Sequence, residues 1–240
     1  EIVKALADKV DHGIFGYAVV PDSCYDAIIA WEGKRNGWKI EKEWILFAPG
    51  AVPAAHMAVQ AYCQPGDRVI LQRPVYYPFF RTIFNNGGLI ANNPLKLTGD
   101  TYEIDFEDFE RQAADPRTTF FILCNPHNPV GRVWHRDELE RMGEICARND
   151  VLVLADELHC DIIMPGNRHI PFAGLNAACR DNSVTVIAPS KTFNLAGLQC
   201  SNIFIENPVL RQKFRRTIDR AGYSQPNALG LFAAQAAYEN

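Results

Sequence analysis

The chain has 240 residues, 48% of them apolar, and a formal net charge of −4 at pH 7. This length and composition suffice for one large hydrophobic core, and no apolar stretch approaches the length of a membrane span. The acidic balance argues against nucleic acid and anionic membranes as partners. Seven dispersed cysteines without a CxxC pair argue for a reducing cytoplasm and against a zinc site or a disulfide framework.

Apolar runs alternate with amphipathic stretches along the chain. We predict strands at Ile45–Ala48, Arg68–Leu71, Gly88–Ala91, Thr119–Leu123, Val151–Ala155, Val184–Ile187 and Asn202–Ile205. We predict helices at Glu1–Val10, Tyr25–Arg35, Ala54–Cys63, Tyr77–Asn85, Phe106–Ala114, Arg136–Asn149, Pro208–Ala221 and Ala228–Tyr238. Several strands are apolar throughout, as expected where helices cover both faces of a mostly parallel sheet. The alternation predicts a doubly wound α/β layer, in which ligands bind at the carboxyl ends of strands.

A carboxylate and an amine lie at two of these strand ends. Asp156 closes the apolar run Val151–Ala155, and Lys191 follows the strand Val184–Ile187 on a predicted loop. A lysine can hold an aldehyde as a Schiff base, and a carboxylate can keep a pyridine nitrogen protonated, so the pair indicates pyridoxal phosphate. The alternatives are a helix cap for Asp156 and a solvated charge for Lys191. The other strand-end motifs favour the cofactor roles.

Three further groups belong to the same predicted edge. Asn128 lies in a turn, residues 125–131, that two prolines constrain, and its amide can donate to the phenolate oxygen of the cofactor. A glycine precedes the first turn of a predicted helix, where the N–H groups of Ala51 and Val52 are free to bind an anion. With the hydroxyl of Ser190, these amides form the predicted phosphate site. The alternatives are an ordinary turn and an ordinary helix start.

Two aromatic residues and a histidine complete the set of candidates. Tyr76 opens a predicted helix at the edge of the sheet and can stack on a pyridine ring. His159 either reaches the ring hydroxyl of the cofactor or is a packed or capping histidine. Tyr17 lies on a glycine-flanked loop, where a surface tyrosine is the alternative. We predict solvated or structural roles for Glu157 and Asp161.

Together these motifs resemble the fold-type I pyridoxal-phosphate enzymes of aminotransferase class I/II, and within that group the MalY/PatB-type cystathionine β-lyases. The resembling segments are HGIFGY at 12–17, PVYYPF at 74–79, CNPHNPVGRVW at 124–134, DELHCDI at 156–162 and APSKTFNLAGLQ at 188–199. The resemblance implies an α/β/α three-layer PLP-transferase large domain over residues 1–240, built on a mostly parallel seven-stranded sheet. It also implies that an N-terminal segment and a C-terminal small domain, which carries the arginine for the substrate carboxylate, lie outside this chain.

The resemblance implies a role for each candidate residue. Lys191 is the Schiff-base lysine, Asp156 pairs with the ring nitrogen, Asn128 and His159 face the ring hydroxyl, Tyr76 stacks on the ring, and Ser190 with the amides of Ala51 and Val52 holds the phosphate. Tyr17 would reach the phosphate of the neighbouring subunit, so a homodimer is implied. His159 stands where aspartate aminotransferases have a tyrosine, and Gln199 stands where they have a phosphate-binding arginine. Both departures fit the C–S lyase group.

The implied activity is α,β-elimination on a sulfur-containing amino acid, which yields a thiol, pyruvate and ammonia. The amine of Lys191 would remove the Cα proton of the substrate. Transamination is the alternative, because it uses the same cofactor residues. A non-catalytic regulator on the same fold is the second alternative, and the presence of both Lys191 and Asp156 argues against it.

Overall fold

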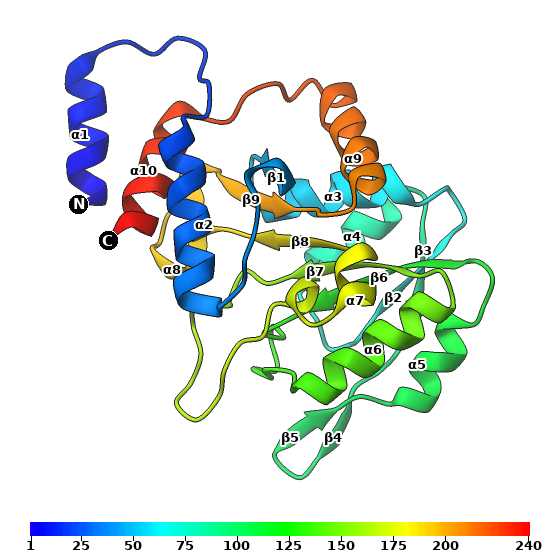
Figure 1. The fold of residues 1–240 in the computed structure, drawn as a ribbon. Helices are drawn as coiled ribbons and strands as arrows, with labels where there is room; N and C mark the ends of the chain where they lie inside the picture. The colour runs from blue at the N-terminus through cyan, green and yellow to red at the C-terminus, as the bar shows by residue number, and fades with distance from the viewer.

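A seven-stranded sheet runs through the centre of the computed structural model, which describes residues 1–240 (Figure 1). Its strands are β1 (Ile45–Ala48), β2 (Arg68–Leu71), β3 (Leu89–Asn92), β6 (Thr118–Cys124), β7 (Leu152–Asp156), β8 (Ser183–Ile187) and β9 (Ser201–Phe204). The spatial order is β1-β9-β8-β7-β6-β2-β3. Neighbouring strands are parallel from β8 through β3, whereas β9 is antiparallel to both β8 and β1. The predicted mostly parallel α/β sheet is confirmed.

Helices cover both faces of the sheet and give the expected three layers (Figure 1). Their bounds are α1 (Ile2–His12), α2 (Asp22–Asn36), α3 (Ala51–Tyr62), α4 (Pro78–Phe84), α5 (Phe106–Ala113), α6 (Arg136–Arg148), α7 (Ala177–Asp181), α8 (Pro189–Thr192), α9 (Pro208–Arg220) and α10 (Ala228–Glu239). Helices α3, α4 and α9 pack on one face. Helices α5, α6 and α7 pack on the other, and α2 and α10 extend that layer over β1 and β9. No helix has both the length and the apolar character needed to cross a bilayer.

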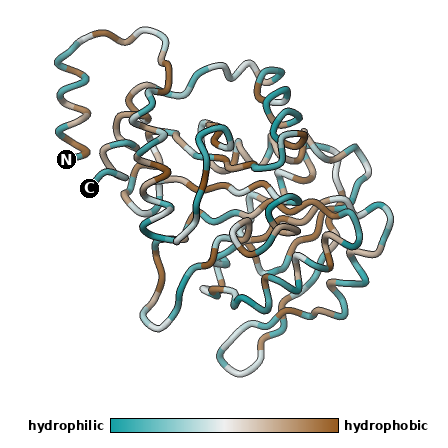
Figure 2. The backbone as a smooth tube through the Cα atoms, in the orientation of Figure 1, coloured by the Kyte–Doolittle hydropathy of each residue, from teal (hydrophilic) through white to brown (hydrophobic).

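Strand alternation divides the core between the two faces. In β6, Phe120 and Ile122 join the cluster under α3, whereas Phe121 and Leu123 join the cluster under α5 and α6. Successive side chains of a strand point to opposite faces, so a strand buried on both sides is apolar at every position. Figure 2 shows the hydrophobic colour recurring along these central strands. This continuous apolar pattern is the reason that the sequence identified the strands.

A short hairpin and a short helix on the far side of the sheet from α3 are among the features that escaped the sequence analysis. Strands β4 (Lys96–Thr98) and β5 (Thr101–Glu103) form an antiparallel hairpin outside the main sheet. Every residue of β4 is exposed, so no buried face gave it an alternating pattern. Helix α7 has only five residues and begins at the side chain of Asn176, which accepts a hydrogen bond from the N–H of Cys179.

Helix α1 lies apart from the sheet beside α10 (Figure 1). None of its residues is buried. The segment that follows it is also exposed, and its exposed apolar side chains include Ile14, Phe15, Tyr17 and Val19. This end of the chain therefore presents an apolar surface that the rest of the chain does not cover.

Two glycines inside helices test the packing of the layers. A Cβ at Gly143 in α6 would lie 2.4 Å from the Sγ of Cys179 and 3.3 Å from the ring of Phe172. A Cβ at Gly33 in α2 would meet nothing closer than a carbonyl oxygen at 4.0 Å. We expect Gly143→Ala to lower the free energy of unfolding by about 1–3 kcal/mol through overpacking. We expect Gly33→Ala to leave it unchanged or raise it by up to about 1 kcal/mol through helix propensity. Urea denaturation measures both, and an equally stable Gly143→Ala variant would contradict the described packing.

Candidate active site

A cavity of about 320 Å³ collects the polar groups at the carboxyl ends of the strands. The predicted site residues that line it are Ala51, Val52, Tyr76, Asn128, Asp156, His159, Ser190 and Lys191. They follow or end β1, β2, β6, β7 and β8, which all run in one direction. The carboxyl ends of such strands meet at one edge of the sheet, so residues distant in sequence share one cavity.

The first turn of α3 offers hydrogen-bond donors to an anion. Gly50 precedes this helix with φ 126° and ψ 164°, a conformation that a residue with a Cβ rarely adopts. The N–H groups of Ala51 and Val52 belong to the helix start, where no preceding turn supplies carbonyl acceptors. The hydroxyl of Ser190 lines the same cavity. This set of donors suits a phosphate group.

Asp156 is the last residue of β7 and lines the cavity. Burial raises the pKa of its carboxyl to about 7, and the negative charge of Glu157 adds to this effect. A hydrogen bond from the N–H of Leu158, at 3.2 Å from Oδ1, and the positive charge of Lys191 both oppose it. Residues 158–161 form a turn and not an α-helix, so the helix-cap alternative is wrong. A cation beside Oδ would favour the ionised carboxylate.

Lys191 lies in the short helix α8, and the prediction that it sits on a loop is wrong. Pro189 occupies the first position of this helix, and Ala188 before it is extended. Proline at that position is preorganised for a helix because its φ is fixed and its missing N–H would have no partner there. The helix places Ser190 and Lys191 on the cavity wall beside the end of β7.

Asn128 belongs to a turn that the sulfur of Cys124 helps to hold. The N–H of Asn128 donates to Sγ of Cys124 at 3.3 Å, and that thiol donates to the carbonyl of Pro126 at 3.4 Å. The ring of His127 contacts the carbonyl oxygen of Pro74 through Nε2 at 3.0 Å, which ties this turn to the segment that carries Tyr76. The side-chain amide of Asn128 makes no hydrogen bond within the chain, so its donors are available in the cavity.

Tyr76 lies two residues before α4, which begins at Pro78, and not at the start of the helix as predicted. Its ring packs edge-on against Phe79, with ring centroids 5.6 Å apart. Burial raises the pKa of Tyr76, as do the charges of Tyr77 and Asp156. The phenol therefore stays neutral near pH 7, and the residue lines the cavity.

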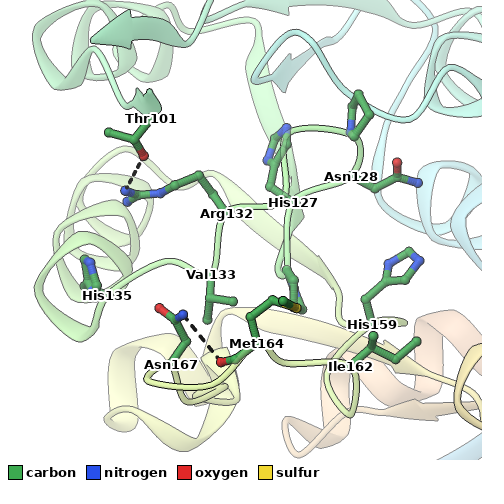
Figure 3. Close-up of a pocket in the computed structure, with 13 residues that line it drawn as sticks. Thr101, His127, Asn128, Arg132, Val133, His135, His159, Ile162, Met164 and Asn167 are labelled. Atoms are coloured by element: carbon green, nitrogen blue, oxygen red, sulfur yellow. Dashed lines mark hydrogen bonds between the residues drawn. The ribbon is translucent and has the colours of Figure 1, made fainter. Parts of the chain in front are cut away.

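His159 lines the candidate site and also a second cavity of about 420 Å³ (Figure 3). Burial lowers the pKa of its imidazole, and the charge of Lys191 lowers it further. Asn128 likewise lines both cavities. The second cavity lies between the turn that carries Arg132 and the loop that carries Met164 (Figure 3).

Arg132, which the sequence analysis did not single out, is committed to a structural pair. Its Nη2 donates to Oε1 and Oε2 of Glu138, both at 2.6 Å. Its Nη1 donates to the hydroxyl of Thr101 at 3.4 Å (Figure 3). The guanidinium also lies over the ring of Trp134, 4.7 Å from its centroid. These contacts fix the turn after Asn128. They also pair the charge of Arg132 with that of Glu138.

The structure does not bring Tyr17 to the candidate site of its own chain. Its side chain is 95% exposed, and it lines a separate hollow with residues of α10 such as Phe232. The predicted contact with a neighbouring subunit stays a prediction.

The donor set in the main cavity fits pyridoxal 5'-phosphate. It offers a free helix N-terminus and a hydroxyl for a phosphate, a primary amine for an aldehyde, and a carboxyl whose high pKa a cationic ring nitrogen would lower. The unpaired amide of Asn128 offers a donor for a phenolate oxygen. The residues of this one cavity therefore supply contacts for the phosphate, the aldehyde, the ring nitrogen and the phenolate oxygen.

The chain is similar in sequence and fold to several bacterial proteins. Cystathionine beta-lyase PatB of Bacillus subtilis (strain 168) is 48% identical over 237 residues, which cover 99% of this chain and 61% of PatB. Cystalysin from Treponema denticola, solved with a pyridoxal 5'-phosphate cofactor, has a TM-score of 0.96 at 37% identity over 100% of this chain and 61% of its own. A PLP-bound putative aminotransferase from Clostridium difficile 630 has a TM-score of 0.96 at 37% identity over 100% of this chain and 62% of its own.

This chain thus spans about three fifths of the length of the relatives that it matches. The resemblance inferred from the motifs, including its PatB-type character, is confirmed by these similarities. The model of the family described as aminotransferase class I and II matches residues 1–239. The chain belongs to the aminotransferase class I and II family.

Proposed function

We propose that this chain is the cofactor-binding part of a pyridoxal-phosphate-dependent C–S β-lyase. The enzyme would act on an amino acid that carries sulfur at Cβ and release a thiol, pyruvate and ammonia. The observation that carries the proposal is the gathering of Lys191, Asp156 and Asn128 in one cavity with a free helix N-terminus. The name of PatB, a cystathionine beta-lyase, supports the choice of reaction.

The predicted site residues that line the cavity would hold the cofactor. The N–H groups of Ala51 and Val52, with the hydroxyl of Ser190, bind the phosphate. Tyr76 would pack against the ring, and Asn128 would donate to its phenolate oxygen, with His159 as a second neighbour of that oxygen. Asp156 would keep a proton on the ring nitrogen, because burial raises the pKa of its carboxyl to about 7 and a cation beside it would favour the ionised form.

When bound, the cofactor supplies an electron sink for the negative charge left at the Cα of the substrate. The amine of Lys191 would hold the aldehyde of the cofactor. Nζ of Lys191 then takes the proton from Cα of the substrate, since the same flexible side chain lies at the wall of the cavity. Loss of the thiol from Cβ and hydrolysis of the remaining three-carbon unit complete the reaction.

Transamination is the second candidate, and the similarity to the putative aminotransferase from Clostridium difficile favours it. It uses the same amine, carboxylate and amide. The difference lies in whether a group leaves from Cβ or a proton returns to the cofactor. These cavity residues therefore support both reactions, and the similarity to PatB favours elimination.

We infer a cytoplasmic homodimer from two further observations. All seven cysteines are free and buried, as suits a reducing compartment. Tyr17 and the neighbouring apolar side chains Ile14, Phe15 and Val19 are exposed, and a second copy of the chain would cover them. Tyr17 would then reach the phosphate of the other subunit. An amino acid is the small-molecule partner.

The reaction itself is tested with L-cystathionine. We expect the purified protein, supplied with pyridoxal phosphate, to release pyruvate and a thiol without any keto-acid acceptor. Coupled assays measure both products. Amino-group transfer from an amino acid to 2-oxoglutarate, without pyruvate release from cystathionine, would contradict the lyase and support the aminotransferase.

The role of Lys191 is tested by Lys191→Ala. We expect turnover to fall by at least roughly 10²–10⁴-fold, because both the attachment point and the base are lost. The control is Lys213→Ala, which removes an exposed lysine of α9 outside the cavity. Appreciable turnover by Lys191→Ala, measured as pyruvate release, would exclude this residue as the base.

The raised pKa of Asp156 predicts a pH dependence of stability in the cofactor-free protein. The folded-state pKa of about 7 exceeds the unfolded value of 3.8, so between these values the unfolded chain loses a proton that the folded chain retains. Stability therefore falls as pH rises from about 4 to about 7, and the loss stays complete at higher pH. Relative to Asp156→Asn, we expect the wild type to lose at most about 4 kcal/mol over this window.

Thermal denaturation at a series of pH values measures this difference. Pyridoxal phosphate should reduce it, because a protonated ring nitrogen stabilises the ionised carboxylate. A difference between wild type and Asp156→Asn that stays constant from pH 4 to pH 7 would contradict the raised pKa.

A further inference from the structure

Asp161 is buried although it lies on the turn after β7, where the sequence predicted a solvated or structural role. Its side chain is only 2% exposed. Oδ2 accepts a hydrogen bond from the hydroxyl of Thr192 at 2.8 Å. Oδ1 accepts one from Nε of Arg35 at 3.3 Å, and Nη2 of Arg35 donates to the carbonyl of Asp161 at 3.2 Å.

These bonds join three segments that surround the candidate site. Arg35 lies near the end of α2, Asp161 lies five residues after Asp156, and Thr192 directly follows Lys191. Asp161 thereby links the segment that carries the carboxylate of the site to the helix that carries its amine. A bridge of this kind fixes the relative position of two elements that are 31 residues apart in sequence.

Helix α8 depends on such external contacts for its orientation. It has four residues, and a single helical turn is not stable by itself. The bond from Thr192 to Asp161 is the one side-chain hydrogen bond that α8 makes in the structure. The hydroxyl of Thr192 therefore binds a buried acceptor and not solvent.

The same end of α8 is held from its apolar side. Phe193, which follows Thr192, packs against Trp31 of α2 with ring centroids 5.4 Å apart. The guanidinium of Arg35 lies 5.9 Å from the ring of Trp31. Phe193 also meets Tyr238 of α10 at 6.2 Å. Helix α2 thus supports α8 both through an ionic bridge and through aromatic packing.

We propose that Asp161 and Thr192 are positioning residues for Lys191. The Arg35–Asp161–Thr192 bridge holds α8 in the orientation in which Nζ of Lys191 can reach the aldehyde of the cofactor in the cavity. This inference rests on the proposed function, because it concerns the amine that captures the cofactor. Neither Asp161 nor Thr192 lines the cavity, so they act through Lys191.

The test follows covalent capture of pyridoxal phosphate by the cofactor-free protein. In that step the nitrogen of Lys191 forms a C=N bond to the aldehyde carbon and water is released, which the visible absorbance band reports. We expect Thr192→Val and Asp161→Asn to slow capture by roughly 10-fold or more, since misplacement of a reacting group by about 1 Å can cost far more than that. We expect Thr192→Ser, which keeps the hydroxyl, to capture within about twofold of the wild type.

A matched control separates positioning from a loss of stability. Thr217→Val also removes a buried threonine hydroxyl, but that hydroxyl donates only to the carbonyl of Lys213 in its own helix. All variants are compared well below their melting temperatures, with visible circular dichroism per unit absorbance as a second readout of how the bound cofactor is oriented. We expect both readouts to change in Thr192→Val and to stay at the wild-type value in Thr217→Val.

The outcomes distinguish this inference from the proposed function. A wild type that gains no visible band with pyridoxal phosphate would overturn both. A wild type that gains the band, with Thr192→Val equally fast and equal in ellipticity, would overturn the positioning role alone. Equal slowing in Thr192→Ser or in Thr217→Val would also overturn it, because the effect would then not depend on the bridge.

Discussion

The direction of the strands is the constraint on which the candidate site depends. Strands β1, β2, β6, β7 and β8 run the same way, so their carboxyl ends meet at one edge. Each end contributes one kind of chemistry there: donors after β1, an aromatic ring after β2, an amide after β6, a carboxyl at β7 and an amine after β8. The antiparallel strand β9 allows β1 to join this set from the far side of β8. The close-packed hydrophobic core on both faces of the sheet holds these strand ends in fixed relative positions.

Two adjacent carboxyl groups at the end of β7 have different roles. Asp156 faces the cavity, where burial raises its pKa to about 7. Glu157 is fully buried, and its two oxygens meet Nε2 of His169 at 3.0 Å and the N–H of Phe172 at 2.8 Å. Glu157 therefore has its partners within the chain, whereas Asp156 has one backbone N–H and a free side for a ligand. The local negative charge of Glu157 in turn makes Asp156 harder to ionise.

The sequence predicted the sheet and most of the site because both leave simple patterns. Strands buried on two faces are apolar at every position, and polar residues interrupt them only at their ends. Contacts made across the fold leave no such pattern. Nothing local distinguishes Asp161 from a solvated aspartate, since its partners Arg35 and Thr192 lie 126 and 31 residues away. The turn of helix at Lys191 was missed because four residues are too few to show a helical period.

The two neighbouring cavities differ in how firmly their walls are fixed. The main cavity is built from strand ends and helix starts that the sheet and the core hold in place. The second cavity shares Asn128 and His159 with it, but its other wall is a loop with exposed side chains, Ile162 and Met164 among them (Figure 3). Loops tolerate substitution better than strands, because fewer buried contacts depend on them. Substitutions of exposed side chains in that loop, such as Met164, therefore alter the space beside His159 while the amine, the carboxyl and the phosphate donors keep their positions.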